Sequence, residues 1–371
     1  MKVMFIVYHD IQTEARTQEI LECTKKIGEA YFVSYSTPID TSNVEVITTE
    51  RRNYFLFILR AIESISRVKP EVIILHDNYC SILLPWIKRF YKNIVIVYDS
   101  SELYIDTTAT TLKIMAASFM KYFEKKYLKT ADVVISANIE RANIMQEYFC
   151  LTEVPIVFDN IHKIEDKFDE VACEKKYSSF FDKNSFCIVY GGGIARQRMT
   201  YELAEAVGTL GSKFRLIIAG SVTESERKKF SSMLGENDYN NIFYVGFVPR
   251  NEWRFLLNRA DASVSAFSQD TVNNIYCASG KLYESLFEGT PIITTENPPL
   301  KRICEDYGVG ISNNNFKESI IELEKNCEEY RVNVKQYVAN INIKKRIDVL
   351  AEKINCKILT KLDMNNNYKK R

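Results

Sequence analysis

Short apolar runs alternate along the first half of the chain with stretches whose apolar residues have helical spacing. The runs predict strands at 3–8, 30–34, 72–75, 94–98, 133–136 and 156–157, and the stretches between them predict helices near 12–27, 54–68, 82–91, 110–129 and 139–149. Continuous apolar strands separated by helices are typical of a parallel sheet that is covered on both faces. With right-handed crossovers, this pattern predicts a Rossmann-like domain over residues 1–160.

The second half repeats the alternation after a polar, charge-rich stretch at 161–184, which we interpret as a linker. Strands are predicted at 186–190, 214–219, 242–245, 262–266, 292–295 and 309–311, with helices near 201–210, 224–234, 251–258, 280–288, 300–305 and from 316 onward. This series predicts a second Rossmann-like domain over 185–340. Residues 341–371 are expected to form a terminal helix that crosses back to the first domain, followed by a polar tail.

Composition narrows the possible classes of protein. A length of 371 residues suits two domains that each bury a core. The net charge of +1 does not favour nucleic-acid binding. The nine cysteines include no CxxC pair, and with no secretory signal they indicate reduced thiols in a cytoplasmic protein. No apolar run approaches the roughly 20 residues of a membrane span.

The predicted helix at 280–288 has chemistry that a purely structural helix does not need. Ser279 can cap its N-terminus and Gly289 can end it. Lys281 lies in the first turn, where its positive charge is repelled by the partial positive charge of the helix N-terminus. An anion such as a phosphate, bound between the ammonium and the N-terminus, would explain a cation at this position. Glu284, one turn later, can accept hydrogen bonds from the hydroxyls of a ribose. The alternative is an ordinary amphipathic helix with a solvated Lys–Glu pair.

The run SGKLYESLFEGTPI at 279–292 resembles the "PxKxxEYxxxGxPV" signature of GT-B glycosyltransferases, in particular the retaining family 4. This resemblance implies an α/β fold of two Rossmann-like domains facing a cleft. It also implies that Ser279, Gly280, Lys281 and Glu284 bind the diphosphate and ribose of a nucleotide-sugar donor. Where many members have an additional Glu, this chain has Cys277.

The run YGGGIARQRM at 190–199 follows a predicted strand and resembles the family's "YxGxxxxxRG" loop. Glycines let the backbone approach a ligand closely. The resemblance implies that Gly192 and Gly193 approach the donor and that Arg198 clamps its diphosphate, with Arg196 as the second choice. It further implies that the backbone at Gly246 and Val248 frames the base. A glycine turn with solvated arginines is the alternative.

Three loops after strands of the first domain are candidates for the acceptor side. The loop at 8–13 lacks Gly-x-Gly, which argues against a dinucleotide pyrophosphate there. We interpret its His9 as a hydrogen-bonded loop residue and leave the role of His76 open. The loop at 98–104 resembles the "YDxHE" acceptor loop, with Asp99, Ser101 in place of its His, and Glu102, which we interpret as functional.

Together with these observations, the resemblance implies a glycosyltransferase that moves a sugar from a nucleoside-diphosphate sugar to a carbohydrate or lipid-linked acceptor, with retention, in cell-surface polysaccharide or glycan assembly. The catalytic candidates are Arg198, Lys281 and Glu102. No metal and no cofactor are expected, because no Asp-x-Asp motif ends a strand. The aromatic and lysine-rich stretches at 86–92 and 110–129 favour peripheral attachment to an anionic membrane surface. The alternatives are an epimerase of the same architecture and a non-catalytic nucleotide-sugar-binding subunit.

Overall fold

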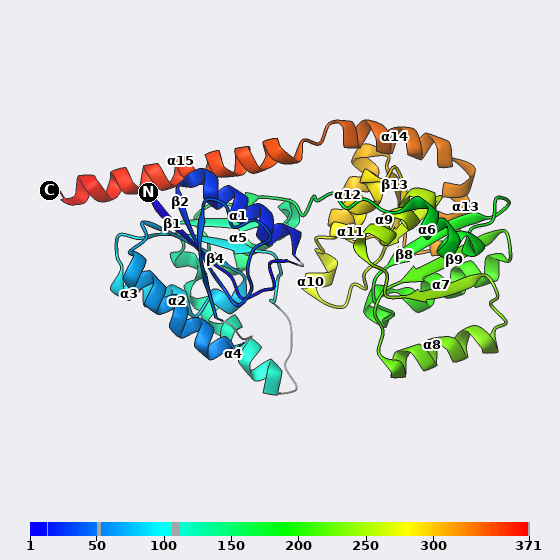
Figure 1. Cartoon of the computed structure of the whole chain (residues 1–371), viewed down its shortest axis with the longest axis horizontal. Helices are drawn as coiled ribbons and strands as arrows, with labels where there is room; N and C mark the ends of the chain where they lie inside the picture. Colours follow the sequence, from blue (N-terminus) through cyan, green and yellow to red (C-terminus); the bar gives the residue numbers. More distant parts are fainter. Residues whose placement is uncertain (13, 50–52, 106–111, 370–371) are drawn as a thin grey trace. The chain divides into compact units, whose positions relative to one another are not determined.

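The structure, a computed structural model, describes residues 1–12, 14–49, 53–105 and 112–369, with the backbone alone described at 112–117 and 362–369. Within these residues the chain forms two compact units (Figure 1). Unit 1 comprises Met1–Asn160 and Asn342–Arg371, and unit 2 comprises Ile161–Ile341. The last helix of the chain therefore belongs to the same unit as the first strand.

Unit 1 contains a parallel sheet of seven strands among its described residues, in the order β3-β2-β1-β4-β5-β6-β7. The strands are β1 Lys2–Ile6, β2 Glu29–Ser34, β3 Val44–Thr48, β4 Val72–His76, β5 Val95–Ser100, β6 Val133–Ser136 and β7 Ile156–Val157. All the predicted strands are present, but β3 was not predicted. It lies at the edge of the sheet and keeps most of its residues at least partly exposed, so it lacks a continuous apolar run.

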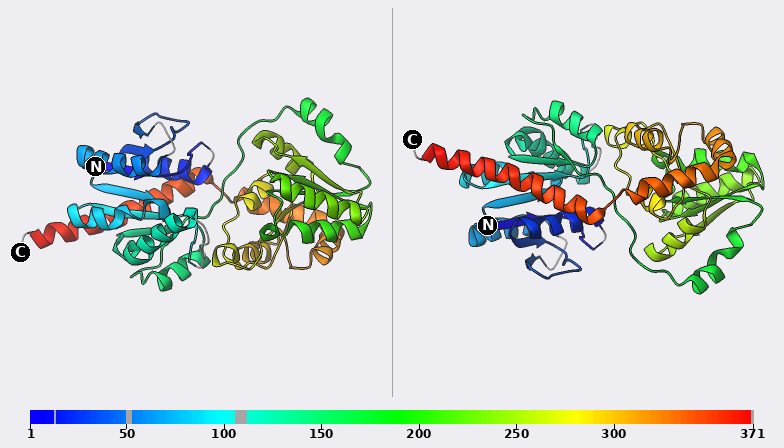
Figure 2. Two further views of the ribbon diagram at one scale, coloured as in Figure 1. Left: turned by 90° about the horizontal axis from the view of Figure 1, so that it is seen from below. Right: turned by 90° about the horizontal axis from the view of Figure 1, so that it is seen from above.

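The helices of unit 1 bury apolar faces against this sheet. They are α1 Ala15–Ile27, α2 Tyr54–Val68, α3 Leu83–Phe90, α4 Leu112–Tyr127, α5 Ile139–Tyr148 and α15 Ile343–Lys369. Helix α15 lies beside α1 (Figure 2), and its Leu350, Ile354 and Ile358 share one buried cluster with Phe5 of β1. The helix runs to Lys369, so it includes polar residues that the sequence analysis expected to form a tail after the helix. Every helix in the described part of the chain is too short or too polar to cross a membrane.

Unit 2 contains, in its described residues, a six-stranded parallel sheet in the order β10-β9-β8-β11-β12-β13. The strands are β8 Phe186–Gly191, β9 Phe214–Ala219, β10 Ile242–Gly246, β11 Ala262–Ser265, β12 Ile292–Thr294 and β13 Gly310–Ser312. The helices are α6 Glu170–Tyr177, α7 Thr200–Leu210, α8 Glu224–Glu236, α9 Arg250–Arg259, α10 Val272–Ile275, α11 Gly280–Phe287, α12 Pro298–Tyr307, α13 Phe316–Lys325 and α14 Cys327–Ala339. The expected α/β class with two Rossmann-like domains is confirmed.

The stretch at 161–184 is part of unit 2. It contains α6, and Tyr177 of that helix packs in one buried cluster with Trp253 and Phe255 of α9. The phenol of Tyr177 also donates a hydrogen bond to Glu252. These contacts cover one face of the sheet, which explains why a stretch without clear periodicity is nonetheless structured.

The order of the strands decides where the candidate loops lie along the edge of each sheet. In unit 1 the order reverses between β1 and β4, and in unit 2 it reverses between β8 and β11. Loops leave in opposite directions at such a point, so a crevice opens beyond the carboxyl ends of the two strands. Of the candidate residues, His9 follows β1, His76 ends β4, Arg198 follows β8 and Lys281 follows β11. The loop at 98–104 instead begins at the end of β5, and Gly246 ends β10.

Candidate functional site

The glycines at the end of β8 and in the loop that follows lie close to other residues of unit 2. A Cβ on Gly191 would lie 2.5 Å from Cζ2 of Trp253, and one on Gly192 would lie 2.6 Å from the hydroxyl of Tyr190. A Cβ on Gly193 would lie 3.1 Å from the carbonyl oxygen of Ser221. The backbone at Gly192 and Gly193, both predicted to bind the donor, is therefore presented without side chains at the reversal point of the sheet.

Arg198 ends a short 3-10 helix, Arg196–Arg198, that follows this loop. Its exposed guanidinium lies 4.4 Å from the ring centroid of Phe267, just beyond β11. Among the described residues it pairs with no carboxylate, so its charge is available to an anion. Met199 adopts φ +53°, in the left-handed region that favours glycine, at the position where the family often has glycine.

Helix α11 begins as the sequence predicts. Ser279 accepts a hydrogen bond from the backbone N–H of Leu282, and its hydroxyl lies 2.7 Å from that of Ser265 at the end of β11. A Cβ at Gly280 would lie 2.2 Å from Cε1 of His162, so any other residue there would displace the imidazole. Lys281 is half-exposed, and its ammonium lies 5.3 Å from the ring centroid of Trp253.

Glu284 is the centre of a buried network. Its carboxylate accepts hydrogen bonds from Lys281 Nζ at 2.8 Å and Trp253 Nε1 at 3.1 Å, and lies 3.2 Å from His162 Nε2. Burial alone would raise the pKa of Glu284, but the hydrogen bond with His162 and the charge of Lys281 lower it to about 2. The carboxylate is thus ionised and oriented, with both oxygens engaged. His162 and Trp253 were not predicted, and no sequence spacing links them to Glu284.

Gly246 and Val248, predicted to frame the base, and Cys277, which replaces a Glu of the family, have different backbone and side-chain surroundings. Gly246 ends β10 with φ +78°. The side chain of Val248 is buried in the cluster that contains Trp253, so only its backbone can face a ligand. Cys277 is also buried, in a cluster with Leu282, so a thiol packs in the core at the position of the family's additional Glu.

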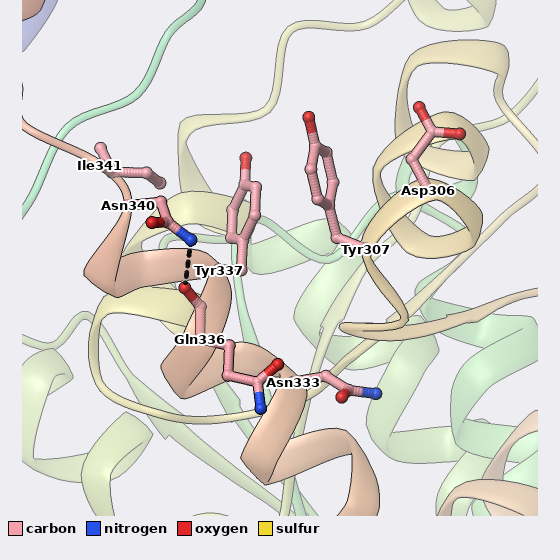
Figure 3. A pocket seen from close by; sticks show the side chains of 7 residues that line it. All are labelled: Asp306, Tyr307, Asn333, Gln336, Tyr337, Asn340 and Ile341. Atoms are coloured by element: carbon pink, nitrogen blue, oxygen red, sulfur yellow. Dashed lines mark hydrogen bonds between the residues drawn. The ribbon is translucent and has the colours of Figure 1, made fainter.

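A separate pocket of about 450 Å³ opens between α12 and α14 of unit 2 (Figure 3). Its walls are Asp306, Tyr307, Asn333, Gln336, Tyr337, Asn340 and Ile341. Asp306 and Tyr307 end the helix that leads into β13, so the pocket lies toward the amino end of that strand. None of the predicted donor residues lines it.

In unit 1, Asp99 joins the buried side chains of Arg16 and His76. Arg16 Nη2 lies 2.5 Å from Asp99 Oδ1 and Arg16 Nε lies 3.2 Å from Asp99 Oδ2, while His76 Nδ1 lies 2.7 Å from the same Oδ2. Burial opposes ionisation, but Arg16 and His76 lower the pKa of Asp99. His76 and Asp99 are both fully buried, and their role on the acceptor side stays a prediction.

Asp77 organises the two neighbouring loops. Its backbone has φ +56°, and its carboxylate accepts hydrogen bonds from the N–H of Ser101 at 2.8 Å, the hydroxyl of Ser101 at 2.5 Å and the N–H of Glu102 at 3.3 Å. Ser101, which replaces the family's His, is therefore held by Asp77. The carboxylate of Glu102 is partly exposed and lies 3.6 Å from Arg141 Nη2.

His9 completes this cluster, with its Nε2 3.5 Å from Asp77 Oδ2 and its ring 5.4 Å from that of His76. The structure thus brings His9, His76, Asp99, Ser101 and Glu102 together, because β1, β4 and β5 are neighbours in the sheet. Sequence reasoning missed three members of the cluster, namely Glu14, Arg16 and Asp77. The position of Asp77 directly after His76 was the one available signal.

Solved structures with similar folds match over 96–100% of this chain. HepE (Alr3699) from Anabaena, in complex with UDP and glucose, has a TM-score of 0.63 at 12% identity, with 100% of this chain and 99% of that chain covered. Sucrose-phosphate synthase from Thermosynechococcus elongatus has a TM-score of 0.66 at 14% identity, covering 100% and 98%. A glycosyltransferase from Rickettsia africae ESF-5 has a TM-score of 0.70 at 15% identity, covering 96% and 98%. No curated protein matches by sequence.

Two parallel Rossmann-like sheets and this likeness define the class: the chain has the GT-B glycosyltransferase fold. Residues 174–341 match the family model described as Glycosyl transferases group 1. The predicted resemblance is thereby confirmed for the part of the chain that carries Arg198, Lys281 and Glu284. Assignment to the retaining family 4 stays a prediction.

Proposed function

We propose that this protein transfers a sugar from a nucleoside-diphosphate sugar to a carbohydrate or lipid-linked acceptor, with retention at the anomeric carbon. The observation that carries the proposal is the reversal point of the unit 2 sheet. There the loop after β8 supplies bare backbone and Arg198, and the segment after β11 leads to Lys281 at the start of α11. This arrangement suits a diphosphate.

The chemistry follows from the charges. As the bond between sugar and diphosphate breaks, negative charge grows on the leaving diphosphate. Arg198, Lys281 and the first N–H groups of α11 stabilise that charge without rearranging, which makes electrostatic stabilisation the main contribution of the protein. These groups supply the cationic charge themselves, so departure of the diphosphate proceeds without a metal. The ordered Glu284 positions Lys281 and accepts hydrogen bonds from the ribose.

Unit 1 supplies the acceptor side in this proposal, with Glu102 as the partly exposed carboxylate of its cluster. The exposed Phe90 of α3, and Phe119 and Tyr122 of α4, support attachment of this unit to an anionic membrane surface, where a lipid-linked acceptor would be met. Residues 110–111 of the stretch expected to bind the membrane lie outside the described residues.

The test is incubation of the purified chain with UDP- and GDP-sugars carrying a labelled sugar, with and without candidate acceptors. UDP is the first choice, since HepE was solved with UDP. Acceptor-dependent release of nucleotide together with label on the acceptor supports transfer. Conversion of the donor sugar without an acceptor indicates the epimerase instead. Binding without any turnover, measured by calorimetry, indicates a non-catalytic subunit.

A further inference from the structure

Two of the chain's three histidines converge on one aspartate at the reversal point of the unit 1 sheet. His9 follows β1, His76 ends β4, and Asp77 follows it. The donor atoms of these three side chains all lie within 4.8 Å of one another. His9 Nε2 is 3.5 Å and His76 Nε2 is 3.6 Å from the same Asp77 Oδ2.

The two separations from Asp77 Oδ2, 3.5 and 3.6 Å, match edges of a metal coordination shell. Hydrogen bonds between such atoms would bring them closer, to about 2.7–3.2 Å. A tetrahedral ion with bonds of about 2.0–2.2 Å instead holds its ligand atoms about 3.3–3.6 Å apart. The observed distances therefore leave room for an ion between the two imidazoles and the carboxylate.

Polar atoms of this cluster lack hydrogen-bond partners in the described part of the chain. Among the described residues, His9 Nε2, His76 Nε2 and Glu14 Oε2 are buried atoms without a hydrogen bond. Glu14 Oε2 lies 3.7 Å from His76 Nε2, beside the same space. Burying polar atoms unsatisfied is costly, and a shared cation would satisfy all three at once.

The surroundings of His76 match those of a metal-binding histidine. Its Nδ1 lies 2.7 Å from Asp99, which fixes the ring and directs Nε2 toward His9 and Asp77. A carboxylate behind the imidazole is typical of zinc sites, where it orients the ring and raises its basicity. Arg16 balances the charge of Asp99, so the carboxylates of Asp77 and Glu14 remain to balance a dication.

We propose that His9, His76 and Asp77 bind a zinc ion, with Glu14 beside the fourth position. Two imidazoles favour Zn²⁺ over Mg²⁺ or Ca²⁺, which prefer oxygen ligands. The inference departs from the expectation of no metal. It depends on unit 1 alone and does not require the proposed glycosyl transfer, whose donor residues lie in unit 2.

The experiment is titration of the chelator-treated full-length chain with ZnCl₂ in a calorimeter, and with CoCl₂ followed by absorption spectroscopy. Exposed Cys150 and Cys356 are changed to Ser throughout, to remove adventitious thiolate ligands. We expect one Zn²⁺ per chain, visible Co²⁺ bands typical of a four-coordinate N/O site, and no measurable Mg²⁺ binding.

Variants locate the ion. His9→Gln and Asp77→Asn should each weaken Zn²⁺ binding at least tenfold, and Asp99→Asn should weaken it about 10–100-fold because it orients His76. His162→Gln removes the remaining histidine, in unit 2, and should bind Zn²⁺ like the parent. Circular dichroism checks that each variant is folded. Absence of binding by the parent, or equal affinity of folded His9→Gln and the parent, would overturn the proposal.

Discussion

Arg198 and Lys281 are the two cations that the proposed mechanism uses directly. We predict that Arg198→Ala and Lys281→Ala each reduce turnover by about 10²–10³, the usual cost of removing one preorganised group that stabilises developing charge. The measurement is steady-state nucleotide release with the donor and acceptor identified as above. Arg227→Ala and Lys229→Ala, which remove exposed, paired cations from α8, are matched controls. Parent-like rates in Arg198→Ala and Lys281→Ala would contradict their assignment.

Glu124 of α4 is a buried carboxyl that the proposed chemistry does not use. It accepts a hydrogen bond from the hydroxyl of Tyr98 at 2.7 Å, and burial raises the pKa of Glu124 to about 8. A pKa raised by folding means that Glu124 favours the folded state while it is protonated. That stability is fully present below the unfolded-state pKa of about 4.5 and is lost as the pH rises through about 8.

We therefore predict that Glu124→Gln, which cannot ionise, becomes more stable relative to the parent as the pH rises from 5 to 8.5, by roughly 1–4 kcal/mol in total. Urea unfolding at a series of pH values measures this difference. Glu63→Gln, which removes an exposed carboxylate on α2, should follow the parent profile. A constant difference between Glu124→Gln and the parent across that range would show that Glu124 ionises normally.

At the scale of elements, the start of α11 depends on close packing between Gly280 and His162. A methyl group at Gly280 would overlap the imidazole, so Gly280→Ala must displace His162 from Glu284. We predict that Gly280→Ala destabilises unit 2 by about 1–3 kcal/mol, because a buried charged acceptor loses one partner.

The double variant Gly280→Ala/His162→Ala separates this cause from a general defect in the helix. In a His162→Ala background the imidazole is absent, so Gly280→Ala should lower the free energy of unfolding by almost nothing further. The effects of the two substitutions, measured by denaturant unfolding, should therefore be strongly non-additive. Gly235→Ala is the matched control. It adds a methyl group to α8 where no atom lies within 4 Å, and it should be neutral or stabilising. Simple additivity of the two changes would refute the packing argument.

At the scale of the whole molecule, the proposed membrane attachment belongs to unit 1. Helix α4 exposes about half of Phe119 and of Tyr122 and carries several lysines toward its end. Each lysine near an anionic surface contributes about 1 kcal/mol to binding. We predict that the chain sediments with anionic liposomes and less with neutral ones, and that changing four lysines to Gln abolishes the difference: Lys121, Lys125, Lys126 and Lys129.

The control for this prediction removes the same charge from unit 2. Lys213, Lys228, Lys229 and Lys317 changed to Gln should leave sedimentation with anionic liposomes unaltered. Equal recovery of the parent in the supernatant with both kinds of lipid would leave an enzyme that acts on a soluble acceptor. If both quadruple variants lost sedimentation with anionic liposomes equally, binding would depend on the net charge of the chain and not on the lysines of α4.

The order of strands and helices could be derived from the sequence, because a buried parallel strand must be apolar throughout and its covering helices must be amphipathic. The start of α11 at Gly280 with Ser279 as its cap, and the glycine loop after β8, depend on local backbone chemistry and were predicted correctly. Strand β3 was not predicted. It pairs with β2 at the edge of the sheet, so most of its positions are partly exposed and its sequence has no continuous apolar run.

Only the tertiary structure decided which side chains meet. Arg16 and Asp99 are 83 residues apart, and His162 and Glu284 are 122 apart, yet each pair is in contact. Local spacing carries no information about such distances, since they depend on how each strand pairs and how each helix packs. For the same reason the sequence indicated only that His9 and His76 follow strands of the first domain, while the fold showed that those strands are neighbours and that the ring nitrogens converge on Asp77.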